Sequence, residues 1–208
     1  MENKYSRINI VFKPPQKVIR RAITLSKEIS KKSNYFFVLD GIKFHPHITI
    51  YSPEFPEYNL NKIIKTVKSL TNNFSKVDFK FKKISAYKGF ISIHFNCSII
   101  IKRIHKEIVE KLNPLREDYK RKKYDNCLDY HMHFNSEQKK NIKKYGYPDS
   151  MNLYSPHLTI IRLKDELYSE NLVKNINWDI PKFTVDKIAI YNMGDHGTCK
   201  ELIREFKI

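Results

Sequence analysis

Two short stretches of this chain are nearly identical: Pro46-His47-Ile48-Thr49-Ile50 and Pro156-His157-Leu158-Thr159-Ile160. In each of them apolar residues alternate with a histidine and a threonine, a pattern typical of a β-strand. Side chains two positions apart on a strand point to the same face. Each stretch therefore predicts a strand that presents an imidazole and a hydroxyl side by side.

The residues that follow the two stretches repeat one order of elements: strand, helix, strand, turn, strand. Hydrophobic spacing predicts these elements at 60–70, 77–81 and 91–95 after the first stretch, and at 165–176, 183–191 and 198–206 after the second. The repeat predicts an α+β fold with two pseudo-symmetric antiparallel sheets, helices on their outer faces and a central cleft where the two motifs meet. We expect residues 1–208 to form a single bilobal domain.

Residues 114–152 separate the two halves and differ from both. They are polar, carry basic runs at 120–123 and 139–144, and show little periodicity apart from a short capped helix expected at 136–144. Long irregular segments of this kind often act as lids or binding loops. A surface excursion without a function is an equally good interpretation. We therefore expect a lid or an insert at 114–152.

The chain is strongly basic. Its 208 residues include 39 Lys and Arg against 22 Asp and Glu, which gives a formal net charge of +17. A domain this basic attracts polyanions, and nucleic acid is the first candidate. The alternative is a charged surface that only keeps the protein soluble. An anionic membrane is a weaker candidate, because no basic amphipathic helix with bulky apolar anchors stands out.

The cysteines and the N-terminus bear on the compartment. Cys97, Cys127 and Cys199 are odd in number and lack the spacing of a metal or redox motif, so they fit a reducing environment. The N-terminal residues lack the apolar run of a signal peptide, and no stretch approaches the length of a membrane span. We expect a cytoplasmic protein. Nothing in the pattern suggests a large exposed apolar face, so we also expect a monomer.

The paired motifs carry groups suited to phosphate esters. Hydrolysis of a phosphodiester needs a base to activate the attacking hydroxyl and an acid to protonate the departing oxygen. Histidine titrates near neutrality and can serve as either. Thr49 and Thr159 are placed to donate hydrogen bonds to the non-bridging oxygens. A single His-x-Thr is a weak signal, but two copies that each open the same order of elements are much stronger.

With these two motifs the chain resembles the 2H phosphoesterase superfamily, which includes RNA 2′,3′-cyclic phosphodiesterases with 2′–5′ RNA ligase activity. The signature of that family is two His-x-Thr/Ser-x motifs roughly one hundred residues apart, each flanked by apolar residues. The resemblance implies a bilobal α+β fold and no required metal or cofactor. It also implies that His47 and His157 act as acid and base, in an order that depends on the direction of the reaction, and that Thr49 and Thr159 bind the phosphate.

Two tyrosines are possible substrate contacts. Strand alternation places Tyr51 on the face of His47 and Thr49, and Tyr154 lies three residues before His157. Each tyrosine suits a packing role equally well. Arg162 alternates away from the predicted catalytic face, so we leave it outside the site.

The remaining histidines give no metal site. His45 with His47, and His131 with His133, form His-x-His pairs. Such a pair binds zinc only where further ligands converge on it, and the sequence fixes no third ligand. His196 lies in a turn between two glycines and is expected to be a solvated turn residue.

Three hypotheses about function follow. The first is a metal-independent phosphodiesterase that hydrolyses RNA-type esters by two-histidine acid/base catalysis. Its candidate substrates are 2′,3′-cyclic phosphates, 2′–5′ linkages and cyclic oligonucleotides, with ligation as the same chemistry run backwards. The second is a basic RNA-binding module without catalysis, and the third is a zinc-dependent hydrolase. In the first two, the partner is RNA or an oligonucleotide, and no membrane is involved.

Overall fold

The structure is a computed structural model that describes residues 4–121, 124 and 134–208. Its strands are β1 (Tyr5–Phe12), β2 (Tyr35–Val38), β3 (Ile48–Tyr51), β4 (Glu54–Pro56), β5 (Val77–Tyr87), β6 (Phe90–Phe95), β7 (His157–Leu163), β8 (Lys182–Val185), β9 (Lys187–Met193) and β10 (Cys199–Lys207). Its α-helices are α1 (Gln16–Ser30), α2 (Leu60–Thr71), α3 (Ile99–Leu112), α4 (Ser136–Tyr145) and α5 (Glu166–Leu172).

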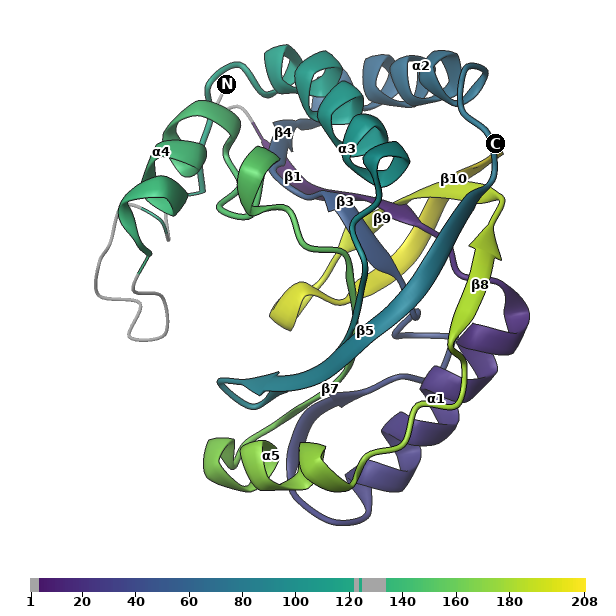
Figure 1. Ribbon diagram of the computed structural model, residues 1–208. Helices are drawn as coiled ribbons and strands as arrows, with labels where there is room; N and C mark the ends of the chain where they lie inside the picture. Colours follow the sequence, from purple (N-terminus) through teal and green to yellow (C-terminus); the bar gives the residue numbers. More distant parts are fainter. Residues whose placement is uncertain (1–3, 122–123, 125–133) are drawn as a thin grey trace.

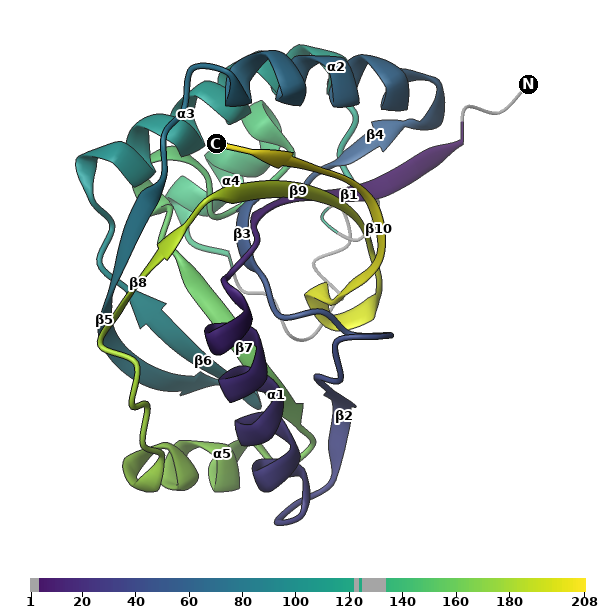
Figure 2. The same ribbon diagram turned by 90° about the vertical axis from the view of Figure 1, so that its right-hand side faces the viewer.

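The strands form two antiparallel sheets (Figure 1). The first sheet has the order β10-β9-β1-β3, with β4 paired to β1, and it carries the first motif because His47 directly precedes β3. The second sheet has the order β2-β7-β6-β5-β8 and carries the second motif, since β7 begins at His157. Figure 2 shows that β9 and β10 curve strongly across the first sheet. The predicted α+β fold with two antiparallel sheets is confirmed.

The two halves of the chain exchange strands between the sheets. The hairpin β5–β6 follows the first motif along the chain, yet β6 pairs with β7 of the second motif. The hairpin β9–β10 follows the second motif, yet β9 pairs with β1 of the first sheet. Each sheet therefore combines one motif strand with a hairpin from the other half, and neither half of the sequence is a lobe by itself.

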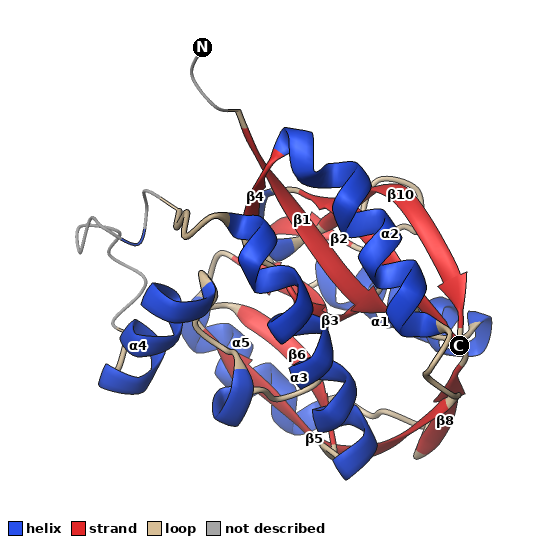
Figure 3. Ribbon diagram, turned by 90° about the horizontal axis from the view of Figure 1, so that it is seen from above, coloured by secondary structure: helices blue, strands red, loops and turns tan. Residues whose placement is uncertain are grey.

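One hydrophobic core joins the two sheets. Phe12 of the first sheet meets Phe79 of the second edge to face, with ring centroids 5.1 Å apart. α2 and α3 lie over the first sheet, whereas α1 and α5 pack on the second at the opposite end of the molecule (Figures 1 and 3). α1 shows why these helices form, because its buried residues Val18, Ala22, Leu25 and Ile29 recur every three or four positions along one stripe. None of the helices within the described residues is long and apolar enough to cross a bilayer.

The segment at 114–152 contains the capped helix that the sequence predicts. α4 begins at Ser136 after Asn135, whose side chain accepts from the amide of Gln138 while the Gln138 side chain accepts from the Asn135 amide. Gly146 ends the helix in the left-handed region at φ 66°. After the second motif the sequence predicts a helix at 165–176. The helix α5 ends earlier, at Leu172, and a 3-10 turn follows it at Val173–Asn175. Half of the basic run at 120–123, residues 122 and 123, lies outside the described residues, and a lid role for this segment stays a prediction.

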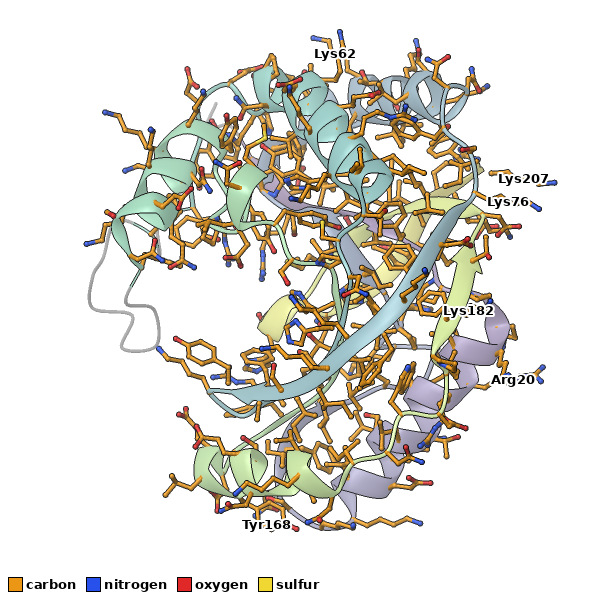
Figure 4. All side chains as sticks on the ribbon, viewed as in Figure 1. Arg20, Lys62, Lys76, Tyr168, Lys182 and Lys207 are labelled. Atoms are coloured by element: carbon orange, nitrogen blue, oxygen red, sulfur yellow. The ribbon has the colours of Figure 1, made fainter. Side chains whose placement is uncertain are left out.

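The excess positive charge is spread over the surface. Figure 4 labels basic side chains that point outward from separate places on the fold: Arg20, Lys62, Lys76, Lys182 and Lys207. All of them are exposed. Net charge alone therefore does not point to one place on the surface.

Candidate active site

The two motif histidines are held in the same way. The Nδ1 of His47 bonds to the carbonyl of His45 at 2.8 Å, and the Nδ1 of His157 bonds to the carbonyl of Ser155 at 2.9 Å. A carbonyl only accepts, so Nδ1 of each ring carries a proton that it donates to this oxygen. Each ring therefore bonds to a backbone oxygen two residues earlier. Both side chains are half-buried.

His47 and His157 belong to a single electrostatic environment. Burial is the main cause that lowers the pKa of His47 to about 4, and the charges of His157 and His45 lower it further. The carbonyls of His45 and Gly197 partly oppose this shift in pKa. His47 is therefore neutral at pH 7 and suited to accept a proton. The hydroxyl of Tyr154, three residues before His157, donates to the carbonyl of Thr49 at 3.0 Å, so the fold brings the two motif segments together.

Both motif threonines are oriented by a neighbouring polar side chain. The Nδ2 of Asn9, a fully buried residue of β1, donates to Thr49 Oγ1 at 3.2 Å. Because Thr49 accepts this bond, its own hydroxyl proton is left to donate elsewhere. On the second sheet the hydroxyls of Ser92 and Thr159 lie 3.2 Å apart. Each threonine thus presents its hydroxyl next to the histidine of its motif. We call the face of the first sheet that carries His47 and Thr49, and the face of the second sheet that carries His157 and Thr159, the motif face of that sheet.

A β-bulge follows the threonine in both motifs. On β3, Thr49 pairs with Val11 and Tyr51 with Ile10, which leaves Ile50 as the extra residue. On β7, Thr159 pairs with Ser92 and Ile161 with Ile91, which leaves Ile160 as the extra residue. One extra residue reverses the alternation of side chains beyond it. Both strands therefore change face immediately after the threonine.

The bulge corrects the expectation for Tyr51. Simple alternation predicts that Tyr51 shares the face of Thr49, but beyond Ile50 the side chain turns into the core, where it is fully buried. Its hydroxyl donates to the carbonyl of Tyr145 at 2.6 Å. Tyr51 therefore packs the first sheet against the end of α4 and offers no open surface to a substrate.

Tyr154 is also a packing residue. Its side chain is only 8% exposed, its hydroxyl donates to the carbonyl of Thr49 at 3.0 Å, and its ring stacks on His105 with centroids 3.9 Å apart. His105 in turn bonds to the carbonyl of Ile50 and the amide of Met151, both at 2.8 Å. Tyr154 and His105 therefore bond to the backbone of the first motif strand from the buried side, and neither side chain lines an open surface.

The second bulge, at Ile160 of β7, brings Arg162 to the motif face, which corrects the expectation that it points away. Its guanidinium lies over the ring of Phe90 at 4.5 Å and over that of Phe36 at 4.8 Å. It also donates to Nδ1 of His196 at 2.7 Å. His196 is therefore held against Arg162 and Phe36, at a left-handed φ of 57°, instead of being a solvated turn residue. Within the described residues, no carboxylate lies at ion-pair distance from Arg162.

The sequence interpretation overlooks two residues that have a visible signal. Asn9 interrupts the apolar run of β1, and His94 alternates with apolar residues on β6. His94 lies directly opposite His157, with ring centroids 5.6 Å apart, and its Nε2 lies 2.7 Å from the hydroxyl of Ser85. A polar residue between apolar residues of a strand is the signal that could have drawn attention to both.

The His-x-His pairs do not form a metal cluster in the described part of the chain. The ring of His45 packs against Tyr191 at 5.2 Å, while its carbonyl holds His47. No group of three potential ligands is present among the described residues. His131 and His133 lie outside the described residues.

A family model described as the 2′-5′ RNA ligase superfamily matches residues 43–197, which include both motifs. The chain therefore belongs to the 2′–5′ RNA ligase superfamily, as the resemblance of the motifs implied. No curated protein matches the chain by sequence at a significant level.

Solved structures show the same fold. The protein TT0787 of Thermus thermophilus is similar at 11% identity and a TM-score of 0.60, with 97% of each chain covered. E. coli LigT in its apo form has 10% identity and a TM-score of 0.57, with 98% of each chain covered. E. coli LigT complexed with phosphate has 7% identity and a TM-score of 0.53, covering 99% of this chain and 98% of that one. At these identities the likeness supports the fold alone.

Proposed function

We propose that this chain is a metal-independent phosphodiesterase that hydrolyses RNA-type phosphodiesters by two-histidine acid/base catalysis. The observation that carries the proposal is the matching arrangement of the motif histidines. Each ring holds its Nδ1 against a carbonyl two residues earlier, at 2.8 Å for His47 and 2.9 Å for His157, and so keeps Nε2 for the reaction. We further propose that the protein is monomeric and cytoplasmic, with RNA or an oligonucleotide as substrate.

His47 takes the role of general base in hydrolysis of a 2′,3′-cyclic phosphate. Its lowered pKa, about 4, keeps the imidazole neutral, so Nε2 accepts a proton from water as the water oxygen bonds to phosphorus. The bond from phosphorus to one ribose oxygen breaks, and His157 supplies a proton to that oxygen. Thr49, Thr159 and the guanidinium of Arg162 donate to the non-bridging oxygens as their negative charge grows.

The same groups suit a 2′–5′ linkage. There the 3′ hydroxyl of the ribose attacks the phosphorus, one histidine accepts its proton, and the other protonates the departing 5′ oxygen. The product is a cyclic phosphate, and the reverse reaction is ligation. Both reactions need one acid and one base on opposite sides of the phosphorus. His47 on the first sheet and His157 on the second can supply these two groups.

A panel of substrates tests the proposal. The chain is incubated, with a metal chelator present, with a 2′,3′-cyclic phosphate, a 2′–5′ dinucleotide and a 3′–5′ dinucleotide. We expect hydrolysis of at least one of the first two and none of the third. Binding of RNA without any turnover would favour the alternative, a basic RNA-binding module supported by the net charge of +17. Turnover that disappears with chelator would favour a zinc hydrolase.

A further inference from the structure

The motif face of the second sheet continues beyond β7 as an ordered surface. Residues paired across antiparallel strands point to the same face. The pairing of β5 with β6 and of β6 with β7 therefore places side chains in rows across the sheet: Lys83, His94 and His157; Ser85, Ser92 and Thr159; Tyr87, Phe90 and Arg162. The bulge at Ile160 keeps Arg162 in the last row. We call the portion contributed by the two neighbouring strands the β5–β6 surface: Lys83, Ser85, Tyr87, Phe90, Ser92 and His94.

This surface is in direct contact with the catalytic motif. The ring centroids of His94 and His157 are 5.6 Å apart, and the hydroxyls of Ser92 and Thr159 are 3.2 Å apart. Arg162 lies over Phe90 at 4.5 Å. Adjacent strands are about 4.8 Å apart, so β5 lies about 10 Å from β7. One or two nucleotides of extended chain span that distance.

The charge of the β5–β6 surface favours a polyanion. Lys83 and the adjacent Lys82 are exposed, and within the described residues neither has a carboxylate at ion-pair distance. His94 is half-buried; burial is the main cause that lowers its pKa to about 4, and Coulombic interactions with His157, Lys83 and Lys82 lower it further. Its Nε2 bonds at 2.7 Å to the hydroxyl of Ser85, which carries no charge. Negative charge would have to come from a ligand.

The end of the hairpin presents an aromatic ring from a rigid position. Tyr87 is 67% exposed and lies opposite Phe90. Lys88 and Gly89 both have positive φ, at 49° and 80°, as in the type I′ turn that suits a two-residue hairpin. Gly89 also bonds to β7, since its carbonyl accepts from the Leu163 amide at 2.8 Å, and a Cβ at Gly89 would lie 2.3 Å from the Leu163 carbonyl oxygen. This anchor holds Tyr87 at the end of the row that contains Arg162.

We propose that the β5–β6 surface binds the nucleotides adjoining the scissile phosphate, so that the substrate is an oligoribonucleotide and not a mononucleotide. Lys83 pairs with a neighbouring phosphate of the chain, and Tyr87 stacks on a neighbouring base. This inference rests on the proposed function, because it takes the phosphate at His157 as the reacting one. It adds a substrate class that the two motifs alone leave open.

Two substrates with the same scissile group test the inference: a mononucleoside 2′,3′-cyclic phosphate and a trinucleotide ending in a 2′,3′-cyclic phosphate. The chain should turn over the trinucleotide with a kcat/KM at least about fivefold higher, since one stacked base contributes roughly 1–3 kcal/mol, which is about 5- to 150-fold. Tyr87→Ala and Lys83→Ala should each lower kcat/KM for the trinucleotide by about fivefold or more and change that for the mononucleotide less than about twofold. Tyr87→Phe, which keeps the ring, should retain the preference.

Lys182→Ala is the matched control for Lys83→Ala, because Lys182 is an exposed lysine of the same sheet at its far edge (Figure 4). It should leave both substrates unchanged. Equal turnover of the two substrates by the wild-type chain would overturn the inference. The inference would also be overturned if Lys83→Ala or Tyr87→Ala lowered kcat/KM equally for both substrates. It would be overturned as well if Lys182→Ala lowered kcat/KM for the trinucleotide by the same factor as Lys83→Ala.

A binding experiment separates failure of this inference from failure of the proposed function. Fluorescence anisotropy measures the affinity of a 3′–5′ trinucleotide for the His157→Ala variant, with and without Lys83→Ala or Tyr87→Ala. If neither the cyclic phosphates nor the 2′–5′ dinucleotide of the panel is turned over but both substitutions weaken binding, the proposed function fails and the oligonucleotide surface stands. The Lys83 substitution should also reduce the slope of log affinity against log salt by about 0.7. If binding is unchanged, the surface has no such role.

Discussion

The hydroxyl of Tyr154 donates a 3.0 Å hydrogen bond to the carbonyl of Thr49. Tyr154 belongs to the segment that leads into the second motif, and Thr49 belongs to the first motif. The bond therefore joins the segment that precedes His157 to the strand β3, which follows His47. His105 supports it by stacking on the Tyr154 ring at 3.9 Å and bonding to the carbonyl of Ile50 at 2.8 Å.

Tyr154→Phe should destabilise the protein, because it removes the donor and leaves a buried carbonyl without that partner. The expected loss in the free energy of unfolding is about 1–2 kcal/mol, measured by urea denaturation. Tyr168→Phe is the control, since Tyr168 of α5 (Figure 4) is half-buried and its hydroxyl makes no hydrogen bond within the described residues. Equal effects of the two substitutions would show that the bond to Thr49 has no special role.

Acid should destabilise the fold through His105. Its Nδ1 donates to Ile50 and its Nε2 accepts from the Met151 amide, so the folded protein holds the ring neutral. Burial lowers its folded pKa from 6.5 to about 4. Between these values the unfolded chain binds more protons, so stability is full above pH 6.5 and falls as pH drops toward 4.

The variant His105→Gln isolates this contribution. His47 and His94 also have a pKa lowered to about 4, and they destabilise the fold in acid in the same way. The variant should therefore still lose part of its unfolding free energy as the pH falls. The fall in unfolding free energy between pH 6.5 and 4 should be smaller in the variant by an amount on the order of 2–3 kcal/mol. A pH dependence that matches the wild-type curve would mean that His105 titrates normally.

Arg162→Lys should impair activity although it keeps the charge. A lysine has no planar guanidinium to lie between Phe36 and Phe90, and it cannot keep the same bond to His196. We expect kcat/KM to fall by about tenfold with little change in stability, measured on whichever substrate the panel identifies. Arg20→Lys, at an exposed arginine of α1 (Figure 4), serves as the control. Full activity of Arg162→Lys would remove Arg162 from the proposed site.

Local sequence signals are enough to predict the strands that carry the motifs and the capped helix α4. Alternation around His47 and His157 and the Asn135–Gln138 capping pair all act within a few residues. The exchange of hairpins between the sheets has no such signal. Strand pairing joins residues far apart in the chain, and nothing local states that β6 pairs with β7.

The bulges explain the remaining errors at the site. Simple alternation predicts Tyr51 on the motif face and Arg162 on the opposite one, and a single extra residue in each strand reverses both expectations. Whether a strand holds an extra residue depends on its partner, because the bulge is a property of the pairing. Neither Ile50 nor Ile160 differs from the apolar residues around it, so the sequence of the motif strand alone carries no sign of the bulge.

The most direct test of two-histidine catalysis is the turnover of His47→Ala and His157→Ala on the substrate that the panel identifies, with the unfolding free energy of each variant measured alongside. General acid–base groups contribute about 10²–10⁴ in rate. We predict that each variant stays folded, still binds the substrate and loses at least about 100-fold in kcat. If either folded variant keeps turnover close to that of the wild-type chain, His47 and His157 do not act together on one phosphorus.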